Sequence, residues 1–175
     1  MAVVSRSELP ESALLGAYAS HAYADCFTAH IGIAVSLEEF VAAFYTTRLF
    51  KLERSILKWA VSKPSTDEQA RQLAAGAIVE FAAWHVEDSA PNQLLLSDMN
   101  NRTKSWLMID PVPSSDGPAT RLYFGSAVVP VRNRKSGKSE MGFVFRALLG
   151  FHQLYSVALL RAAVSRLKAM EEKKN

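Results

Sequence analysis

The sequence predicts an α+β fold in which a curved antiparallel sheet wraps around one long C-terminal helix. Three observations support this prediction. A strand-like segment near the start of the chain is followed by short helical stretches. Four segments rich in β-branched and aromatic residues come next, and a long, almost wholly apolar helical stretch follows them. Elements in this order bury their apolar faces by packing the sheet against the helix.

Length and composition predict one domain that covers residues 1–175. The chain has 175 residues, of which 49% are hydrophobic and 21% are charged, and it contains a single cysteine. Such a chain can bury a core without disulfides, so disordered and disulfide-stapled classes are excluded. We expect residues 1–17 to be irregular and residues 166–175 to form a charged tail exposed to solvent.

The first strand is predicted over residues 18–33. Polar and apolar side chains alternate there with a period of two, which is the pattern of a half-buried strand. The alternation places Asp25, Phe27 and Ile31 on one face and Cys26 and Thr28 on the other.

Short helices are expected directly after Ser36, over residues 49–61 and over residues 67–75. Ser36 caps the first helix, because Glu39 three residues later completes a capping box. The second helix must end before Pro64, whose ring is incompatible with a continuing helix. Ser65 or Thr66 caps the third.

Four further strands are predicted over residues 78–87, 93–99, 104–109 and 120–129. The segments between them have turn compositions. Connections this short join antiparallel neighbours, because a parallel crossover needs about a dozen residues or more. The four strands are therefore predicted to form a meander.

A long helix is predicted over residues 142–173. Its polar arc is narrow, since Arg146, Gln153 and Arg161 fall within one quadrant of the helical wheel. A helix that is apolar on most sides must be covered by the rest of the protein. The same polar residues argue against a membrane span, because charged side chains are costly in the bilayer.

Five short phrases accompany this order of elements: YADCF at 23–27, FAAW at 81–84, RTKSW at 102–106, LYFGS at 122–126 and FHQL at 151–154. The order resembles the helix-grip fold of START-like and birch-pollen-allergen-like proteins, the SRPBCC superfamily that includes polyketide cyclases. The phrases are similar to a small bacterial family of unknown function within it. The resemblance implies an apolar cavity between sheet and helix. We count five strands where the superfamily has six or seven, and a strand in 128–134 or a split first strand would complete the count.

Aromatic side chains on the predicted strands and helix are candidates to line the implied cavity. They are Trp84, Trp106, Tyr123, Phe151 and Tyr155. The alternative for each is simple core packing, which is the commoner role of large apolar side chains.

The polar candidates for contact with a ligand are Asp25, His85, Arg121 and His152. Asp25 lies within a strand, where a buried carboxylate can act as a general acid or base; an ion pair with Arg54 or Arg121 is the alternative. Arg121 can hold a ligand carboxylate or phosphate with two hydrogen bonds. His152 lies on the apolar face of the helix, where it contacts either a ligand or a structural partner. His85 enters the cavity only if its face of the sheet is concave.

No cofactor or metal site is expected. The four histidines lack metal-ligand spacing, no base accompanies Cys26, and the chain has no glycine-rich phosphate loop. The basic segment 132–138 lacks interleaved aromatic residues, so nucleic acid is not an expected partner. The start of the sequence lacks the pattern of a signal peptide, so we expect a cytoplasmic protein, for which a homodimer is one allowed state.

The leading functional hypothesis is binding of an apolar or aromatic small molecule, or a lipid, between the sheet and the helix. A cyclase- or dehydratase-type enzyme is the alternative, and it requires at least two of Asp25, His85 and His152 to converge in one pocket. A third hypothesis is a partner-binding protein whose apolar helix docks another chain, which requires a contiguous exposed apolar patch.

Overall fold

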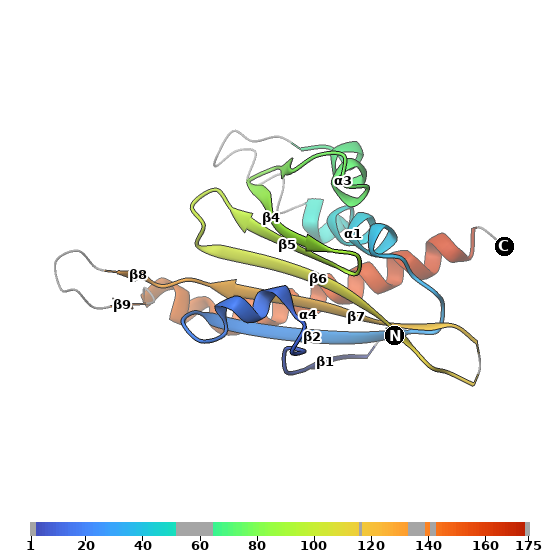
Figure 1. Ribbon diagram of the computed structural model, residues 1–175, viewed down its shortest axis with the longest axis horizontal. Coiled ribbons are helices and arrows are strands. Elements are labelled where there is room, and N and C mark those ends of the chain that lie inside the picture. Colours follow the sequence, from blue (N-terminus) through green and yellow to red (C-terminus); the bar gives the residue numbers. More distant parts are fainter. Residues whose placement is uncertain (1–2, 52–64, 116, 133–138, 141–142, 174–175) are drawn as a thin grey trace.

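A seven-stranded antiparallel sheet dominates the computed structural model, which describes residues 3–51, 65–115, 117–132, 139–140 and 143–173 (Figure 1). The strands are β1 (Val4–Arg6), β2 (Tyr23–Ile31), β3 (Glu80–Phe81), β4 (Trp84–Ala90), β5 (Gln93–Asp98), β6 (Thr103–Val112) and β7 (Ala119–Val128). They lie in the order β1-β2-β7-β6-β5-β4-β3, and each neighbouring pair is antiparallel. Strands β4 to β7 form the predicted meander, and β2 pairs with β7 at its far side.

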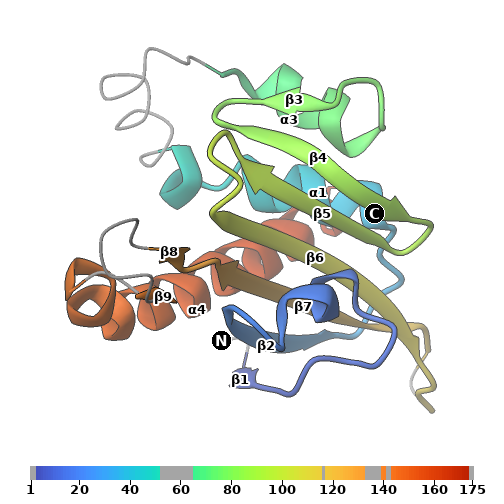
Figure 2. The same cartoon turned by 60° about the vertical axis from the view of Figure 1, so that its left-hand side comes forward.

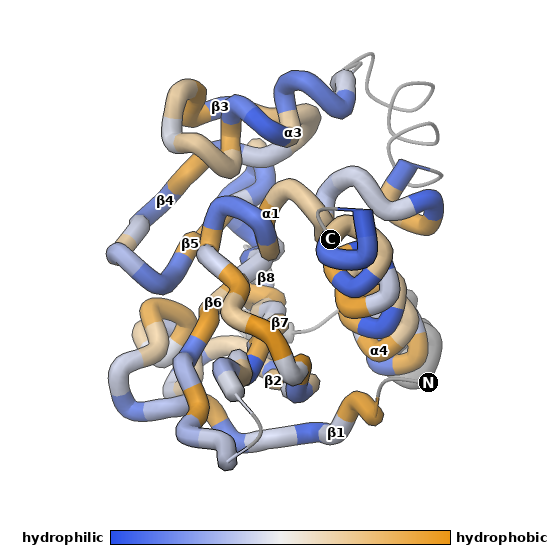
Figure 3. Tube along the Cα trace, turned by 90° about the vertical axis from the view of Figure 1, so that its right-hand side faces the viewer, coloured by the Kyte–Doolittle hydropathy of each residue, from blue (hydrophilic) through white to orange (hydrophobic). Residues whose placement is uncertain are grey.

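The sheet lies between two unequal layers. Helices α1 (Leu37–Tyr45) and α4 (Phe143–Glu171) cover one face, and the short 3-10 helix η1 (Leu14–Tyr18) lies on the other (Figure 2; Figure 3 shows α4 nearly end-on). Helix α3 (Asp67–Ala74) packs against α1. A small hairpin of β8 (Val131–Arg132) and β9 (Ser139–Glu140) precedes α4. The structure confirms the α+β class, with a curved antiparallel sheet and a C-terminal helix.

Alternate residues of the central strands belong to two separate cores. Phe27 and Phe124 lie in the larger core, which α1 and α4 cover. Cys26 and Trp106 lie in the smaller core, which Leu15 of η1 helps to cover. Because successive side chains of a strand point to opposite faces, the central strands are buried on both sides.

The predicted helix starts are confirmed by their capping hydrogen bonds. The backbone N–H of Glu39 donates to Ser36 Oγ at 3.1 Å, and Ser36 N–H donates to the Glu39 carboxylate at 3.0 Å. Thr66 caps α3 in the same way with Gln69. The helix predicted over 142–173 is confirmed as α4. Of the helix predicted over 49–61, residues 52–64 lie outside the described residues.

The number of strands is corrected from five to seven in the main sheet. The segment predicted as one strand over 78–87 is interrupted, because Ala82 takes a positive φ of 53° and β4 turns back on β3. Strand β1 is the second addition, and it lies in the N-terminal segment that we expected to be irregular. Strand β8 does fall in 128–134, but it pairs with β9 outside the main sheet.

Two predicted boundaries are also corrected. The first strand begins at Tyr23 rather than at residue 18, because the preceding residues form η1 and a turn. The tail expected over 166–175 is helical as far as Glu171, and Leu167 within it is buried in the larger core. In the part of the chain that the structure describes, no helix has both the length and the apolar character needed to cross a membrane.

Candidate functional site

The pairing of β2 with β7 places a carboxylate and a hydroxyl side by side on the face that α4 covers. Asp25 stands opposite Ser126 in the register of these two strands. Asp25 shares its face with Phe27, and Ser126 shares its face with Phe124, as a period of two requires. Both phenylalanines lie in the larger core, so Asp25 and Ser126 point toward the helix. The side chain of Asp25 has no exposed surface.

His152 reaches this pair from α4 and completes a polar cluster of three side chains. Ser126 Oγ donates to Asp25 Oδ1 at 2.7 Å, and the same oxygen lies 2.7 Å from His152 Nε2. His152 Nε2 is also 3.6 Å from Asp25 Oδ2. That distance is too long for a direct hydrogen bond, so Ser126 is the bridge between the carboxylate and the imidazole.

Two further residues, Tyr23 and Gln153, extend the hydrogen bonds of the cluster beyond Asp25 Oδ2. Tyr23 donates its hydroxyl to Asp25 Oδ2 at 3.2 Å, and Gln153 Nε2 donates to the Tyr23 hydroxyl at 3.1 Å. Burial raises the pKa of Tyr23, and the charge of Asp25 adds to this although the Gln153 hydrogen bond lowers it. Tyr23 therefore stays a protonated donor at neutral pH. Because His152 and Gln153 are neighbours in α4, their bonds to the two strands orient the helix about its axis.

A pocket of about 150 Å³ lies beside His152, between the sheet and the helix. Five aromatic side chains and one leucine line it, together with six polar side chains. The lining residues are Phe44, Phe50, Trp84, Thr103, Lys104, Ser105, Phe124, Ser126, His152, Tyr155, Ser156 and Leu159. We call this space the inner pocket. Three of the predicted ligand-binding residues, Trp84, His152 and Tyr155, line it, and Asp25 contacts it through Ser126.

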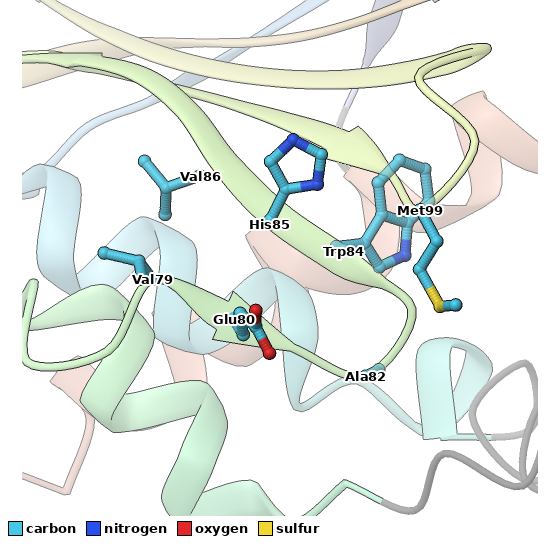
Figure 4. A pocket seen from close by; sticks show the side chains of 7 residues that line it. All are labelled: Val79, Glu80, Ala82, Trp84, His85, Val86 and Met99. Carbon is cyan, nitrogen blue, oxygen red and sulfur yellow. The ribbon is translucent and has the colours of Figure 1, made fainter.

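A larger depression of about 530 Å³ lies at the edge of the sheet, around the β3–β4 hairpin (Figure 4). Trp84 lines this depression as well as the inner pocket, and His85 lines only the depression. His85 stands opposite Ser97, whose hydroxyl accepts a hydrogen bond from Lys104 Nζ. That ammonium lies over the ring of Tyr18 in η1. His85 is therefore on the face away from α4, so the condition under which it would enter the cavity between the sheet and α4 is not met.

Three other predicted ligand-binding residues also lie on the η1 face of the sheet. Trp106 and Tyr123 belong to the smaller core, and Trp106 Nε1 donates to Gln93 Oε1 at 2.9 Å. Arg121 donates to the hydroxyl of Tyr123 at 3.3 Å and to His30 Nε2 at 3.2 Å. None of the three lines the inner pocket, because the thickness of the sheet separates them from it.

The same placement corrects one expected partner of Asp25. Arg121 lies on the opposite face of the sheet and cannot form an ion pair with Asp25. The carboxylate instead accepts hydrogen bonds from the hydroxyl groups of Ser126 and Tyr23, and the imidazole of His152 lies nearby. Arg54 lies outside the described residues, as does the side chain of Phe151, although residue 151 belongs to α4.

Cys26 is buried in the smaller core and is not a nucleophile. Burial raises the pKa of its thiol from 9.0 to about 12, and the charge of Asp25 adds to the rise. The thiol is therefore protonated at neutral pH, whereas the thiolate is the reactive form.

This raised pKa makes stability depend on pH in the alkaline range. Because the folded pKa exceeds the unfolded value, the contribution of the thiol is fully present below about pH 9 and is lost as the pH rises toward about 12. We expect the free energy of unfolding of the wild type to fall more steeply over this range than that of Cys26→Ala. Chemical denaturation at a series of pH values measures both slopes, and equal slopes would contradict the assignment.

Several residues of the site were not found by sequence reasoning. Ser126 was not among the polar candidates, although its alternation with Phe124 places it on the inner face. Phe44 and Phe50 lie in helical segments, and tertiary packing decides which face of such a segment points toward the pocket, so the sequence alone did not identify them. Ser105 lines the pocket from β6, where its hydroxyl lies 3.0 Å from that of Tyr45. Among the residues that the structure describes, no group of three or more His, Cys, Asp or Glu side chains is placed to hold a metal ion.

The seven antiparallel strands, the long C-terminal helix and the pocket between them are consistent with the helix-grip fold. No family model matches the chain, and no curated protein matches it. Among solved structures the chain is similar to the crystal structure of CalU16 from Micromonospora echinospora, with 13% sequence identity and a TM-score of 0.29. The match covers 97% of this chain and 94% of that one. At this TM-score the match carries no functional argument, and the chemistry of the site rests on the geometry above.

Proposed function

We propose that the protein binds a small aromatic or apolar molecule in the inner pocket. The observation that carries this proposal is a space of about 150 Å³ walled by aromatic rings between the sheet and α4. A cavity of about this volume is large enough for a benzene-sized molecule. Most ligand pockets are larger, so a single ring fits this volume better than a lipid chain.

The polar groups of the pocket favour a ligand that is not purely hydrocarbon. His152 and Ser126 both line the pocket, and Ser126 Oγ lies 2.7 Å from His152 Nε2. The buried indole N–H of Trp84 has no acceptor among the residues that the structure describes. Buried polar groups normally have hydrogen-bond partners, and a bound molecule with an acceptor atom can supply one.

Binding is tested with the purified 175-residue chain and three single-ring probes, which are toluene, phenol and acetophenone. Ligand-observed NMR measures binding, and native mass spectrometry shows whether a small molecule copurifies. Ser156→Leu places a larger side chain in the pocket and should abolish binding of all three probes. Met99→Ala, in the separate edge depression, should leave binding unchanged. If the wild type binds none of the probes and copurifies with no molecule, the proposal is wrong.

A second candidate function is proton transfer to or from a bound carbonyl compound, as in a cyclase- or dehydratase-type enzyme. The observation that favours it is the convergence of Asp25 and His152 beside the inner pocket. In D2O, a base in the pocket would remove a methyl proton of acetophenone and a deuteron would replace it. NMR follows this exchange. Catalysis is supported if the wild type exchanges the methyl protons faster than buffer alone does and His152→Gln loses this acceleration. If exchange with the wild type is no faster than in buffer alone, the protein binds acetophenone without catalysing proton transfer.

The partner-binding hypothesis receives little support from the described part of α4. Among the α4 side chains from His152 onward, Leu154 is the one large apolar side chain that is exposed, with 72% of its surface accessible. A single exposed leucine is common on soluble proteins and does not form a docking surface.

A further inference from the structure

We propose that the inner pocket selects a neutral phenol, whose hydroxyl donates a hydrogen bond to Nδ1 of His152. This inference rests on the proposed function and names the chemical class of the ligand. It follows from the hydrogen-bond roles within the cluster of Asp25, Ser126 and His152.

The hydroxyl of Ser126 settles which nitrogen of His152 carries the proton. It has one hydrogen, and this hydrogen goes to Asp25 Oδ1 at 2.7 Å, since a carboxylate only accepts. His152 Nε2 lies 2.7 Å from the same oxygen, so it must donate its own hydrogen to Ser126. In a neutral imidazole one nitrogen donates and the other accepts. Nδ1 is then the acceptor.

The other hydrogen bonds of the cluster keep Ser126 as the donor to Asp25 and His152 Nε2 as the donor to Ser126. Asp25 also accepts from Tyr23, which in turn accepts from Gln153. The carboxylate is fully buried, so these protein groups, rather than water, determine its hydrogen bonding. Asp25 and Ser126 are positioning residues that hold His152 with Nε2 toward the strands.

Nδ1 of His152 is free to receive a ligand. It has no hydrogen-bond partner among the residues that the structure describes, and 26% of the His152 side chain is exposed. His152 lines the inner pocket together with Phe124 and Tyr155. An unpaired acceptor beside aromatic walls suits a ring that carries a hydrogen-bond donor.

Charge excludes an anionic ligand such as a benzoate. The buried carboxylate of Asp25 lies next to His152, and like charges repel at this range. The cation among the described lining residues is Lys104, but its ammonium binds Glu87 and lies over Tyr18 on the other face. A neutral phenol supplies a donor without a charge.

The test compares phenol with toluene, which differ in the hydroxyl group. We expect the wild type to bind phenol about tenfold more tightly, the effect of one good hydrogen bond, and to bind benzoate more weakly than toluene. Equal affinities for phenol and toluene would overturn the phenol assignment while leaving the proposed function intact. Failure of phenol, toluene and acetophenone to bind, with no copurifying molecule, would instead overturn the proposed function.

Two substitutions of His152 separate the roles of its nitrogens. The amide of Gln can reach the position of Nε2 and donate to Ser126, but it places no acceptor at Nδ1; the shorter Asn places its oxygen near Nδ1. We expect His152→Gln to lose the preference for phenol and His152→Asn to retain part of it. A preference that persists in His152→Gln would overturn the assignment.

The tautomer is also measurable without any ligand. Two-dimensional ¹⁵N NMR of the imidazole groups, with the His152 signals identified by their absence in His152→Gln, should show a hydrogen on Nε2 and none on Nδ1. A hydrogen on Nδ1 would overturn the proposal even if the variants are too unstable for titration.

Discussion

Trp106→Ala is expected to lower the free energy of unfolding by about 4 kcal/mol, in the range for truncation of a buried tryptophan. Trp106 is fully buried in the smaller core and contacts the ring of Tyr123, with centroids 6.0 Å apart. Its indole N–H donates to Gln93 Oε1, which also accepts from the backbone N–H of Leu14 at 2.9 Å. The substitution therefore leaves a cavity and weakens the attachment of the N-terminal segment. Chemical denaturation measures the change.

Trp84→Ala is the matched control for this prediction. Trp84 is only partly buried, and its indole N–H has no acceptor among the described residues. Its truncation removes less packing and no hydrogen bond, so we expect a smaller loss of stability than at Trp106. If the two substitutions destabilise the protein equally, the distinction between the two tryptophans is wrong.

Gly125→Ala is expected to lower the free energy of unfolding by about 2 to 3 kcal/mol through overpacking. A Cβ atom at this position would lie 2.8 Å from Leu15 Cδ2, 2.8 Å from Trp106 Cε3 and 3.0 Å from the carbonyl oxygen of Asp25. The carbonyl belongs to the neighbouring strand and cannot move without shifting β2. The substitution should therefore also disturb the Ser126–Asp25 hydrogen bond and weaken binding in the inner pocket.

Gly16→Ala provides the control for Gly125→Ala. Apart from Gly16 itself, its two chain neighbours and the adjoining helix backbone, no atom lies within 4 Å of a Cβ built on Gly16, so we expect little change or a small gain in stability. Urea denaturation of the two variants, with phenol affinity as a second measurement, tests the prediction. A Gly125→Ala variant as stable as the wild type would contradict the prediction, because β2 and β7 would then move apart without loss of free energy of unfolding.

Local patterns predicted the elements of this fold well, because capping and hydrophobic periodicity are local properties. The capping box at Ser36 and the long apolar helix needed no knowledge of tertiary structure. The division of the 78–87 strand was missed, since it depends on a positive φ at Ala82, a residue that rarely adopts one.

The site was predicted only in part, because its members are distant in sequence. Asp25 and His152 were identified as candidates, but Ser126 joins them only through the pairing of β2 with β7, across 101 residues. Trp106 was left between the cavity and simple core packing, because both faces of β6 are apolar and alternation could not show which face lies toward the helix. The structure resolves this by placing Leu107 in the larger core and Trp106 in the smaller one.

Because the two cores lie on opposite faces of the sheet, we expect the elements that cover them, η1 and α4, to unfold locally and independently of each other. Gln93 connects the N-terminal segment to the sheet, since it accepts from Leu14 and donates to the carbonyl of Ser12 at 2.9 Å. Detachment of η1 breaks these bonds but none of the hydrogen bonds by which His152 and Gln153 hold α4 to the strands. Local unfolding of such a unit costs less than global unfolding. A ligand in the inner pocket should therefore slow hydrogen exchange in α4 much more than in η1.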